Sequence, residues 1–300
     1  MPDRLDVLKT YKLFIDGKFP RTESGRSWPL NSAAGEPIAH LSLASRKDLR
    51  EGVEAARRAQ PGWAGATPYN RGQVLYRMAE MLEGKRDELA QAIASLAPAR
   101  SAKGKGRQAT ASLTPQDEVS LSIDRLVCFA GWADKYAQVL GCNNPVAGPF
   151  YNFTITEPTG VVACIAPDSP SLLGLISLLA PPLCAGNAVV VLSGGTNPIP
   201  AAVLGEVCAT SDVPAGVVNI LTGMRGELLG FVASHRDIDA IHAAGVSTDE
   251  RVLVEKGIAE NLKRVKVHAQ TPWTDAAACH SPWWIEPFIE FKTIWHPASV

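Results

Sequence analysis

The sequence predicts an α/β fold built on an open, Rossmann-like parallel sheet. Three short apolar runs bounded by Gly, Pro, Asn and Ser lie at 160–166, 187–192 and 217–221. Each segment between them is long enough for one helix, and this alternation is typical of βαβ units. The runs are continuously apolar, as in strands buried on both faces. Because such sheets bind ligands at the carboxyl ends of their strands, we expect any site in the turns that follow these runs.

The composition is that of an ordinary globular protein. The 300 residues are 46% hydrophobic and 20% charged, and one or two domains are expected. A net charge of −1 argues against nucleic acid as a partner. No apolar run is long enough to cross a membrane, and the start shows no signal-peptide pattern. Six cysteines without a Cys-x-x-Cys pair indicate reduced thiols, so we expect a cytoplasmic location.

The first third of the chain predicts strands followed by helices. Residues 11–43 suggest two or three antiparallel strands, with the Asp-Gly pair at 16–17 as a hairpin turn. A helix is expected over 48–60, ended by the Pro-Gly pair at 61–62, and a longer helix over 70–96.

Residues 97–116 change in composition. They are small, polar and basic, and they predict a flexible loop. Lys103, Lys105 and Arg107 offer positive charge to an anionic partner, but a solvated loop is the simpler interpretation.

The rest of the chain alternates helices and strands. A helix is expected over 117–140 and a strand over 150–156. The remaining expected elements are helices at 171–184, 225–234 and 248–260, and strands at 238–243 and 265–267.

The tail at 284–295 partly alternates apolar and polar residues, which indicates a strand with one buried face. Because an uncovered edge strand promotes aggregation, we expect this strand to pair with the N-terminal strands or with another chain. We divide the chain into a sheet-containing domain at 1–267 and an irregular segment with a terminal strand at 268–300.

Several motifs occur in a fixed order along the chain. They are Glu157-Pro-Thr-Gly-Val-Val, Ile165-Ala-Pro, Ala185-Gly-Asn-Ala-Val-Val-Val, Val213-Pro-Ala-Gly-Val-Val-Asn-Ile-Leu-Thr-Gly and Asn261-Leu-Lys. This set resembles the cofactor domain of the aldehyde dehydrogenase family. More narrowly, the chain resembles the truncated, non-catalytic second unit of two-unit family-sixteen aldehyde dehydrogenases. The resemblance implies a Rossmann-like NAD or NADP domain with small antiparallel oligomerisation strands.

The turn after the first sheet strand departs from the family pattern. Asp168 and Ser169 stand where the family has Trp-Asn, whose amide helps to stabilise an oxyanion. A carboxylate at 168 opposes negative charge, whereas Ser169 keeps one hydroxyl donor. The spacing also suits Ser169 as a helix N-cap, with Pro170 at the first helical position.

The cofactor residues that the resemblance implies are partly lost. Ser193 and Thr196 stand where the family's Lys and Glu hold the adenosine ribose. Two interpretations remain: their hydroxyls bind a ribose weakly, or the segment is a plain turn. Gly223 and Gly226 resemble the family's glycine turn, and Gly245 its pyrophosphate turn without the serine donor. We expect these five vestigial candidates to bind no cofactor tightly, and NAD or NADP if any.

The catalytic groups of the family are a cysteine thiolate that attacks the aldehyde and a glutamate that activates water. His268 lies in the segment aligned with the glutamate's motif and is a candidate base. Cys279 is the only candidate nucleophile by position. Only 33 residues follow position 267, so we expect the catalytic domain to be absent. We therefore assign no catalytic residue and keep Cys279, His268 and Ser169 as candidates. The histidine spacing predicts no metal site.

Three functions remain open. The first, which we favour, is a catalytically deficient subunit with a structural or regulatory role. It assembles with itself or with a full-length aldehyde dehydrogenase through the strand at 284–300. The second is an NAD(P)-dependent oxidoreductase acting on aldehydes, alone or completed by a partner chain. The third is a nucleotide-sensing module that binds without turnover.

Overall fold

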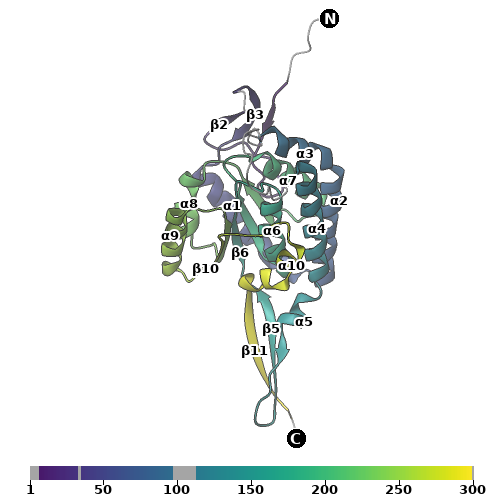
Figure 1. Ribbon diagram of the computed structural model, residues 1–300. Coiled ribbons are helices and arrows are strands. Elements are labelled where there is room, and N and C mark those ends of the chain that lie inside the picture. The colour runs from purple at the N-terminus through teal and green to yellow at the C-terminus, as the bar shows by residue number, and fades with distance from the viewer. Residues whose placement is uncertain (1–6, 33–34, 97–112, 299–300) are drawn as a thin grey trace, which may run out of the picture.

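A five-stranded parallel sheet lies at the centre of the molecule (Figure 1). The structure, a computed structural model, describes residues 7–32, 35–96 and 113–298. In chain order the strands are β6 (Val161–Ile165), β7 (Ala188–Leu192), β8 (Val218–Leu221), β9 (Ala240–Ala244) and β10 (Arg264–His268). All five predicted strands are confirmed. The four strands β6 to β9 are completely buried, which is why their sequences do not alternate.

The strand order is β10-β9-β6-β7-β8. From β6 the chain builds outwards through β7 to β8, and it then returns to place β9 and β10 on the other side of β6. The order therefore reverses between β6 and β9. In open α/β sheets, the carboxyl ends of two such strands border the ligand crevice.

Helices cover both faces of the sheet. One face packs against α1 (Arg46–Gly65), α8 (Arg225–Ser234) and α9 (Thr248–Gly257), whose apolar side chains share one core with the strands. The other face packs against α6 (Leu173–Ala185) and α7 (Ile199–Thr210), within a second and larger core.

Every residue of α6 is buried. Its outer side is covered by α2 (Pro68–Gly84) and α4 (Pro115–Trp132), which form a further helical layer in Figure 1. This double coverage explains why α6 is apolar all round instead of amphipathic. Within the described ranges, no helix is both long and apolar enough to cross a membrane.

The predicted end of the first helix at its Pro-Gly pair is wrong. Helix α1 continues through Pro61 to Gly65. Its last turn is held by tertiary contacts, because the Trp63 indole donates to the Leu183 carbonyl at 3.0 Å. The buried Arg71 guanidinium also donates to two carbonyls at the helix end, which would otherwise lack partners.

Two long helices predicted as continuous are each interrupted. The segment 70–96 forms α2 and α3 (Arg86–Ser95), separated at Lys85, whose ammonium bridges Glu88 at 2.8 Å and Glu206 at 2.6 Å. The segment 117–140 forms α4 and α5 (Tyr136–Leu140).

The predicted loop at 97–116 lies mostly outside the described residues, as do Lys103, Lys105 and Arg107. Its last two residues belong to α4, which begins at Pro115 behind the N-cap hydroxyl of Thr114.

The N-terminal strands form a separate three-stranded sheet. These strands are β1 (Lys9–Tyr11), β2 (Ser27–Asn31) and β3 (Pro37–Ser42). The predicted all-antiparallel arrangement is wrong, since β1 runs parallel to β3 and only β2 runs antiparallel to it. The predicted turn at 16–17 is confirmed, with both residues in the left-handed region and Ile15 paired to Lys18.

A two-stranded ribbon projects from the body in Figure 1. It consists of β5 (Phe150–Pro158) and β11 (Ile289–Pro297), paired antiparallel over their whole length, with the short β4 (Cys142–Asn143) on the far edge of β5. The predicted terminal strand is confirmed, but its partner is β5 and not the N-terminal sheet.

The strand begins at Ile289 and not at position 284, because a short helix and two 3₁₀ turns precede it. These are α10 (Ala276–Cys279), η2 (Pro282–Trp284) and η3 (Glu286–Phe288); the other 3₁₀ turn described, η1 (Ile258–Glu260), follows α9.

Candidate functional site

The turns after β6, β7 and β9 meet at the carboxyl edge of the sheet. They lie so close that side chains are excluded at two glycines. A Cβ on Gly194 would lie 2.6 Å from the Pro167 carbonyl oxygen, and one on Gly245 would lie 3.0 Å from the Pro167 Cβ. Gly245 also has φ +64°, a conformation that favours glycine. The edge where we predicted a ligand is therefore closely packed.

Arg225, the first residue of α8, lies across the carboxyl ends of β6 and β9, at the switch point where an open α/β sheet has its ligand crevice. We call this place the crevice. Its guanidinium donates to the carbonyl oxygens of Ala166 and Gly245, each at 2.9 Å. Carboxylates of Asp168 at 3.7 Å and Glu250 at 3.6 Å flank it, and the side chain is only 11% exposed. A cation with five N–H donors therefore bridges the two strand ends at the topological switch point.

Asp168 closes the neighbouring turn. One of its carboxylate oxygens accepts N–H bonds from Gly195 at 2.6 Å and Thr196 at 3.2 Å. These main-chain donors follow β7, where a parallel sheet would present them to an anionic ligand. Asp168 thus uses those donors itself and places a negative charge at the mouth of the crevice.

The structure brings the five predicted cofactor residues to this one edge, in different environments. Ser193 is buried, and among the described atoms its hydroxyl has no hydrogen-bond partner. Thr196 is exposed and bonded to Asp168 through its N–H. Gly223 packs against Ala44, and Gly226 has open space around it.

Ser169 is not the N-cap of the following helix, contrary to our prediction. Helix α6 begins only at Leu173, and Ser169 is exposed. The free N–H groups of Leu172 and Leu173 are bonded instead to the carboxylate of Glu118, at 2.7 and 3.3 Å. Burial raises the pKa of Glu118, against the lowering effect of these N–H bonds. A distant helix, α4, supplies the cap that the local sequence suggested.

His268 and Cys279 line one pocket of about 350 Å³ beside the carboxyl end of β10. The His268 ring stacks on Trp284 with centroids 4.2 Å apart. Its Nε2 lies 2.8 Å from Nε2 of His242, whose Nδ1 contacts the Leu178 carbonyl at 2.7 Å. The carbonyl requires a donor, so Nδ1 of His242 carries the proton and its Nε2 accepts from His268.

Both imidazoles are neutral at physiological pH. Burial, with the nearby Lys266 charge, lowers the pKa of His268 to about 4. Burial and the His268 charge lower the pKa of His242 well below its usual value. Because the shared proton sits on Nε2 of His268, that nitrogen is a donor and not a free base.

Cys279 does not have the properties of an activated nucleophile. The residue is fully buried, and its thiol donates to the Pro272 carbonyl at 3.4 Å. Burial raises the pKa of the thiol, and the neighbouring Arg125 lowers it less than burial raises it. The adjacent His280 uses its carbonyl to accept from the Trp132 indole and makes no contact that would deprotonate Cys279 among the described residues. The thiolate that covalent catalysis needs is therefore disfavoured.

Sequence reasoning missed the roles of Arg225, Glu250 and His242. The spacing Ser247-x-x-Glu250 is a capping-box signal, and the structure confirms that box at the start of α9. A histidine within the apolar β9 run signals a buried polar partner. No local pattern indicates that Arg225 turns back over the sheet. Among the described residues, no group of three His, Cys, Asp or Glu side chains could hold a metal.

The parallel sheet covered by helices on both faces, its switch point between β6 and β9 and the projecting ribbon define an α/β protein of the doubly wound class. Comparison with known families makes the assignment narrower. Residues 21–269 match the family described as "Aldehyde dehydrogenase family". The chain belongs to the aldehyde dehydrogenase family.

Known relatives are longer than this chain. It is 34% identical over 262 residues to retinal dehydrogenase 2 of Mus musculus, covering 86% of this chain and 48% of that protein. It is 33% identical over 258 residues to cytosolic aldehyde dehydrogenase 1 of Elephantulus edwardii, covering 85% and 49% respectively. The chain thus spans about half the length of the relatives it matches.

Solved structures show the same coverage. A point mutant of aldehyde dehydrogenase from Bacillus cereus superposes with a TM-score of 0.77 at 27% identity. The NAD+ complex of aldehyde dehydrogenase from the same organism gives a TM-score of 0.74 at 26% identity. Each match covers 86% of this chain and 50% of the other.

Proposed function

We propose that this chain is a catalytically deficient aldehyde dehydrogenase-like subunit. It acts structurally or as a regulator, assembled with itself or with a full-length aldehyde dehydrogenase, in the cytosol. The observation that carries the proposal is the Arg225 guanidinium, bonded to Ala166 and Gly245 inside the crevice. An occupied crevice and a protonated, buried Cys279 both argue against aldehyde oxidation by this polypeptide.

The residues at the sheet edge do not fit a dinucleotide. A bound NAD or NADP would need main-chain N–H groups for its phosphates and hydroxyl partners for its ribose. Asp168 holds two of those N–H groups, and its charge opposes a phosphate. Ser193 is buried beneath the turn. We therefore expect no tight cofactor binding at this edge.

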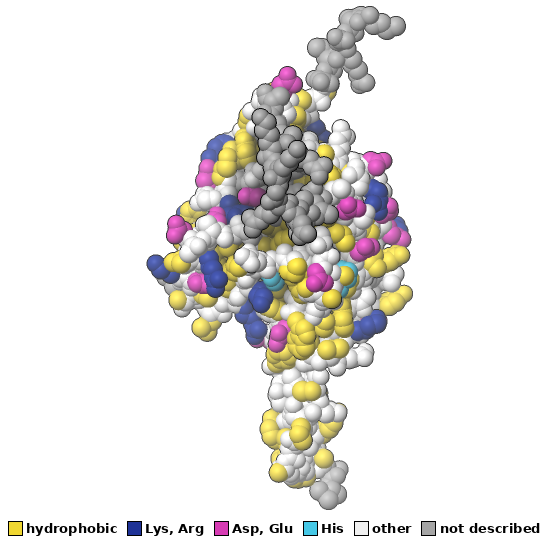
Figure 2. Space-filling model, viewed as in Figure 1, with side chains coloured by type: hydrophobic (Ala, Val, Ile, Leu, Met, Phe, Trp, Pro, Cys, Tyr) yellow, Lys and Arg dark blue, Asp and Glu magenta, His cyan; other side chains and the backbone are white. Residues whose placement is uncertain are grey.

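The assembly part of the proposal depends on the β5–β11 ribbon. Residues 141–156 and 293–298 contain no Lys, Arg, Asp or Glu. On the face shown in Figure 2, the outer part of the ribbon carries hydrophobic and no charged side chains. Phe150, Tyr151, Phe291 and Trp295 are all more than 40% exposed. Exposed aromatic side chains on a ribbon whose outer part is uncharged, with β11 as an edge strand, favour a protein partner.

The second candidate function is an NAD(P)-dependent oxidoreductase acting on aldehydes. One observation favours it, namely that His268 and Cys279 line the same pocket. A titration separates the two functions. The wild-type chain should show no saturable NAD or NADP binding below the millimolar range by calorimetry and should reduce neither cofactor with an aldehyde panel.

A double variant tests whether Arg225 and Asp168 are what prevents NAD from binding in the crevice. Arg225→Ala/Asp168→Ala should bind NAD about tenfold tighter than wild type, because the donors and the space are released. Arg251→Ala/Asp249→Ala is the matched control, since it removes the same two charges from exposed positions of α9 and should change nothing. Micromolar NAD binding at the crevice or steady turnover by the wild-type chain would contradict the proposal.

A further inference from the structure

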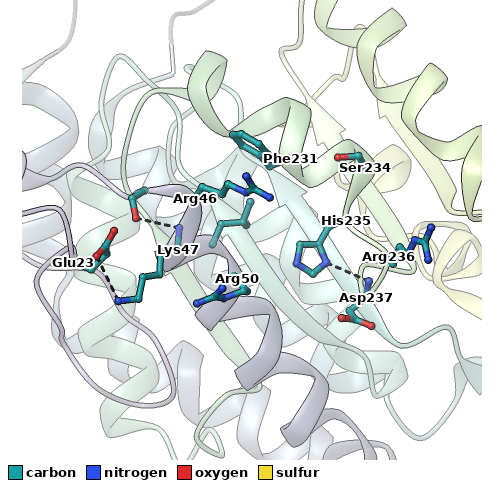
Figure 3. Close-up of a pocket in the computed structure, with 11 residues that line it drawn as sticks. Glu23, Arg46, Lys47, Arg50, Phe231, Ser234, His235, Arg236 and Asp237 are labelled. Atoms are coloured by element: carbon teal, nitrogen blue, oxygen red, sulfur yellow. Dashed lines mark hydrogen bonds and ion pairs between the residues drawn. The ribbon is translucent and has the colours of Figure 1, made fainter.

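A second pocket, of about 690 Å³, lies between the first turns of α1 and the end of α8 (Figure 3). Arg46, Lys47 and Arg50 enter it from α1, and Phe231 from α8. His235 and Arg236 lie on the turn that leads from α8 to β9. It shares no lining residue with the crevice of Arg225 and Asp168 or with the β5–β11 ribbon, so it is a separate feature of the molecule.

The pocket carries more positive than negative charge. Four cations line it (Arg46, Lys47, Arg50 and Arg236), against two carboxylates (Glu23 and Asp237). Burial lowers the pKa of His235, which keeps that ring neutral at physiological pH. The lining residues therefore carry a net charge of +2.

The ion pairs that the cations make are few and long. The Glu23 carboxylate pairs with Lys47 at 3.5 Å, and Arg50 pairs with Glu54 at 3.6 Å along its own helix. Arg46 lies over the Phe231 ring, 4.8 Å from its centroid, and has no carboxylate partner in the described part of the chain. Its guanidinium edge is therefore available to an anion.

The position of these cations works against the helix. Arg46, Lys47 and Arg50 lie in the first turns of the 20-residue α1, where the helix dipole already creates positive potential and acidic residues are favoured. The one acidic residue of that turn, Asp48, is buried and turned away to bond Thr22 and the Ser45 N–H. Departures from local helix preference are expected at functional sites, so this cluster is a candidate site.

We propose that this pocket binds a phosphorylated small molecule, with the phosphate held by Arg46 and Arg50 and the organic part against Phe231 and Leu49. The planar guanidinium fork matches phosphate oxygens in a bidentate manner. The volume lies in the range of small-molecule sites and exceeds what a single inorganic ion needs. Phe231 is 40% exposed, so it offers an apolar surface next to the cations.

The test is a calorimetric titration of the full chain with phenyl phosphate, inorganic phosphate and sodium benzoate. Phenyl phosphate should bind most tightly, because only it supplies both the phosphate and the ring. Arg46→Gln/Arg50→Gln should weaken its binding by roughly tenfold or more. Arg46→Lys/Arg50→Lys, which keeps the charge without the fork, should recover only part of the affinity.

Arg77→Gln is the control, an exposed arginine on α2 paired with Glu80, and it should bind phenyl phosphate as wild type does. Circular dichroism shows whether each variant is folded, and these exposed positions should leave the spectrum unchanged. Equal binding by wild type and Arg46→Gln/Arg50→Gln overturns the proposal, as does equal loss in Arg77→Gln. A duplex oligonucleotide that binds more tightly than phenyl phosphate through these arginines would also overturn it, in favour of nucleic acid.

The pocket and the crevice are distinguishable with one further titration. Any NAD binding that disappears in Arg46→Gln/Arg50→Gln belongs to this pocket and supports the present proposal. NAD binding that survives those changes belongs to the crevice and bears only on the proposed function.

Discussion

The His242–His268 pair shows how single residues decide the chemistry of this chain. His268 ends β10 in the segment where the resemblance implies the family's catalytic glutamate, yet its Nε2 proton is committed to His242. Stacking on Trp284 removes one face of the ring from water. The His268 imidazole, which lies in the segment of the expected catalytic group, thus joins strands β9 and β10 to the terminal segment.

The free energy of unfolding should depend on the protonation of His268. Its pKa falls from the ordinary 6.5 to about 4 in the folded protein. Between these pH values the unfolded chain binds more protons than the folded chain, so stability falls as pH is lowered through 6.5 towards 4 and levels off below. A shift of this size is worth at most about 3 kcal/mol.

His268→Gln should lose part of that dependence, because glutamine keeps a donor towards His242 and does not titrate. Urea unfolding at pH 7 and pH 4.5 measures the effect. His296→Gln, which changes an exposed histidine of β11, should keep the wild-type pH dependence. Parallel stability curves for wild type and His268→Gln would show that this imidazole is not the titrating group.

Arg225 is a second single residue that decides the chemistry, in this case at the crevice. The sequence suggested a glycine turn there, because Gly223 and Gly226 flank it. The side chain between them, not the glycines, determines what the turn can bind.

Buried polar side chains hold the ends of whole elements in place. Helix α1 and helix α6 end side by side, and Arg71 of α2 donates to the carbonyls of Ala64, Ala66 and Cys184. Helix α6 begins on the Glu118 carboxylate of α4. Each of these bonds replaces a partner that the terminal turn of a helix lacks.

Arg71→Met should therefore destabilise the protein by about 2–4 kcal/mol, because it leaves three carbonyls in a buried region without donors. Arg77→Met on the same helix is the control. Arg77 is half-exposed and makes only an i,i+3 pair with Glu80, so its loss should cost less than about 0.5 kcal/mol. Urea denaturation with an unchanged m-value measures both, and similar midpoints for the two variants would contradict the capping role of Arg71.

On the scale of the whole molecule, the sheet body and the ribbon differ in how they place their apolar side chains. The body buries its apolar surface on both faces of the sheet. The ribbon extends away from it and exposes aromatic side chains, among them Trp295 at 59%. Trp295 packs edge-on against Phe150 across the two strands, with centroids 5.8 Å apart.

Trp295→Lys should dissociate the assembly that we propose, because it puts a charge into an uncharged contact surface. Sedimentation velocity gives the oligomeric state. Trp283→Lys is the control, since Trp283 is also 59% exposed but lies in η2 on the body. An oligomer that persists in Trp295→Lys and dissociates in Trp283→Lys would place the contact elsewhere. Truncation from position 284 is less informative, because Ile285, Phe288 and Ile289 belong to the core.

The fold was predictable where the pattern was local. Four of the five sheet strands, β6 to β9, follow from short apolar runs, since a strand covered on both faces has no polar side to show. The family followed from motifs in a fixed order, and the match over residues 21–269 agrees. The turns that hold the five candidate cofactor positions lie at one sheet edge, because parallel strands share their carboxyl ends; that these residues are vestigial cofactor positions stays a prediction.

Errors arose wherever distant residues override a local signal. Pro61 predicts a helix end, but Trp63 and Arg71 carry α1 beyond it. Ser169 is a good N-cap by sequence, but Glu118 occupies that role. The N-terminal strands look like a simple meander, yet β1 pairs with β3 in parallel.

The sequence by itself determined the sheet, its buried strands and the family, because apolar periodicity and motif order are properties of neighbouring residues. Only the tertiary structure decided that Arg225 and Asp168 occupy the crevice, that His268 donates to His242, and that β11 pairs with β5. The physical reason is that a side chain's partners elsewhere in the fold determine how far it is buried, which of its atoms carries a proton and where it points. Those partners lie 26 to 139 positions away for the His268, Asp168 and β11 contacts.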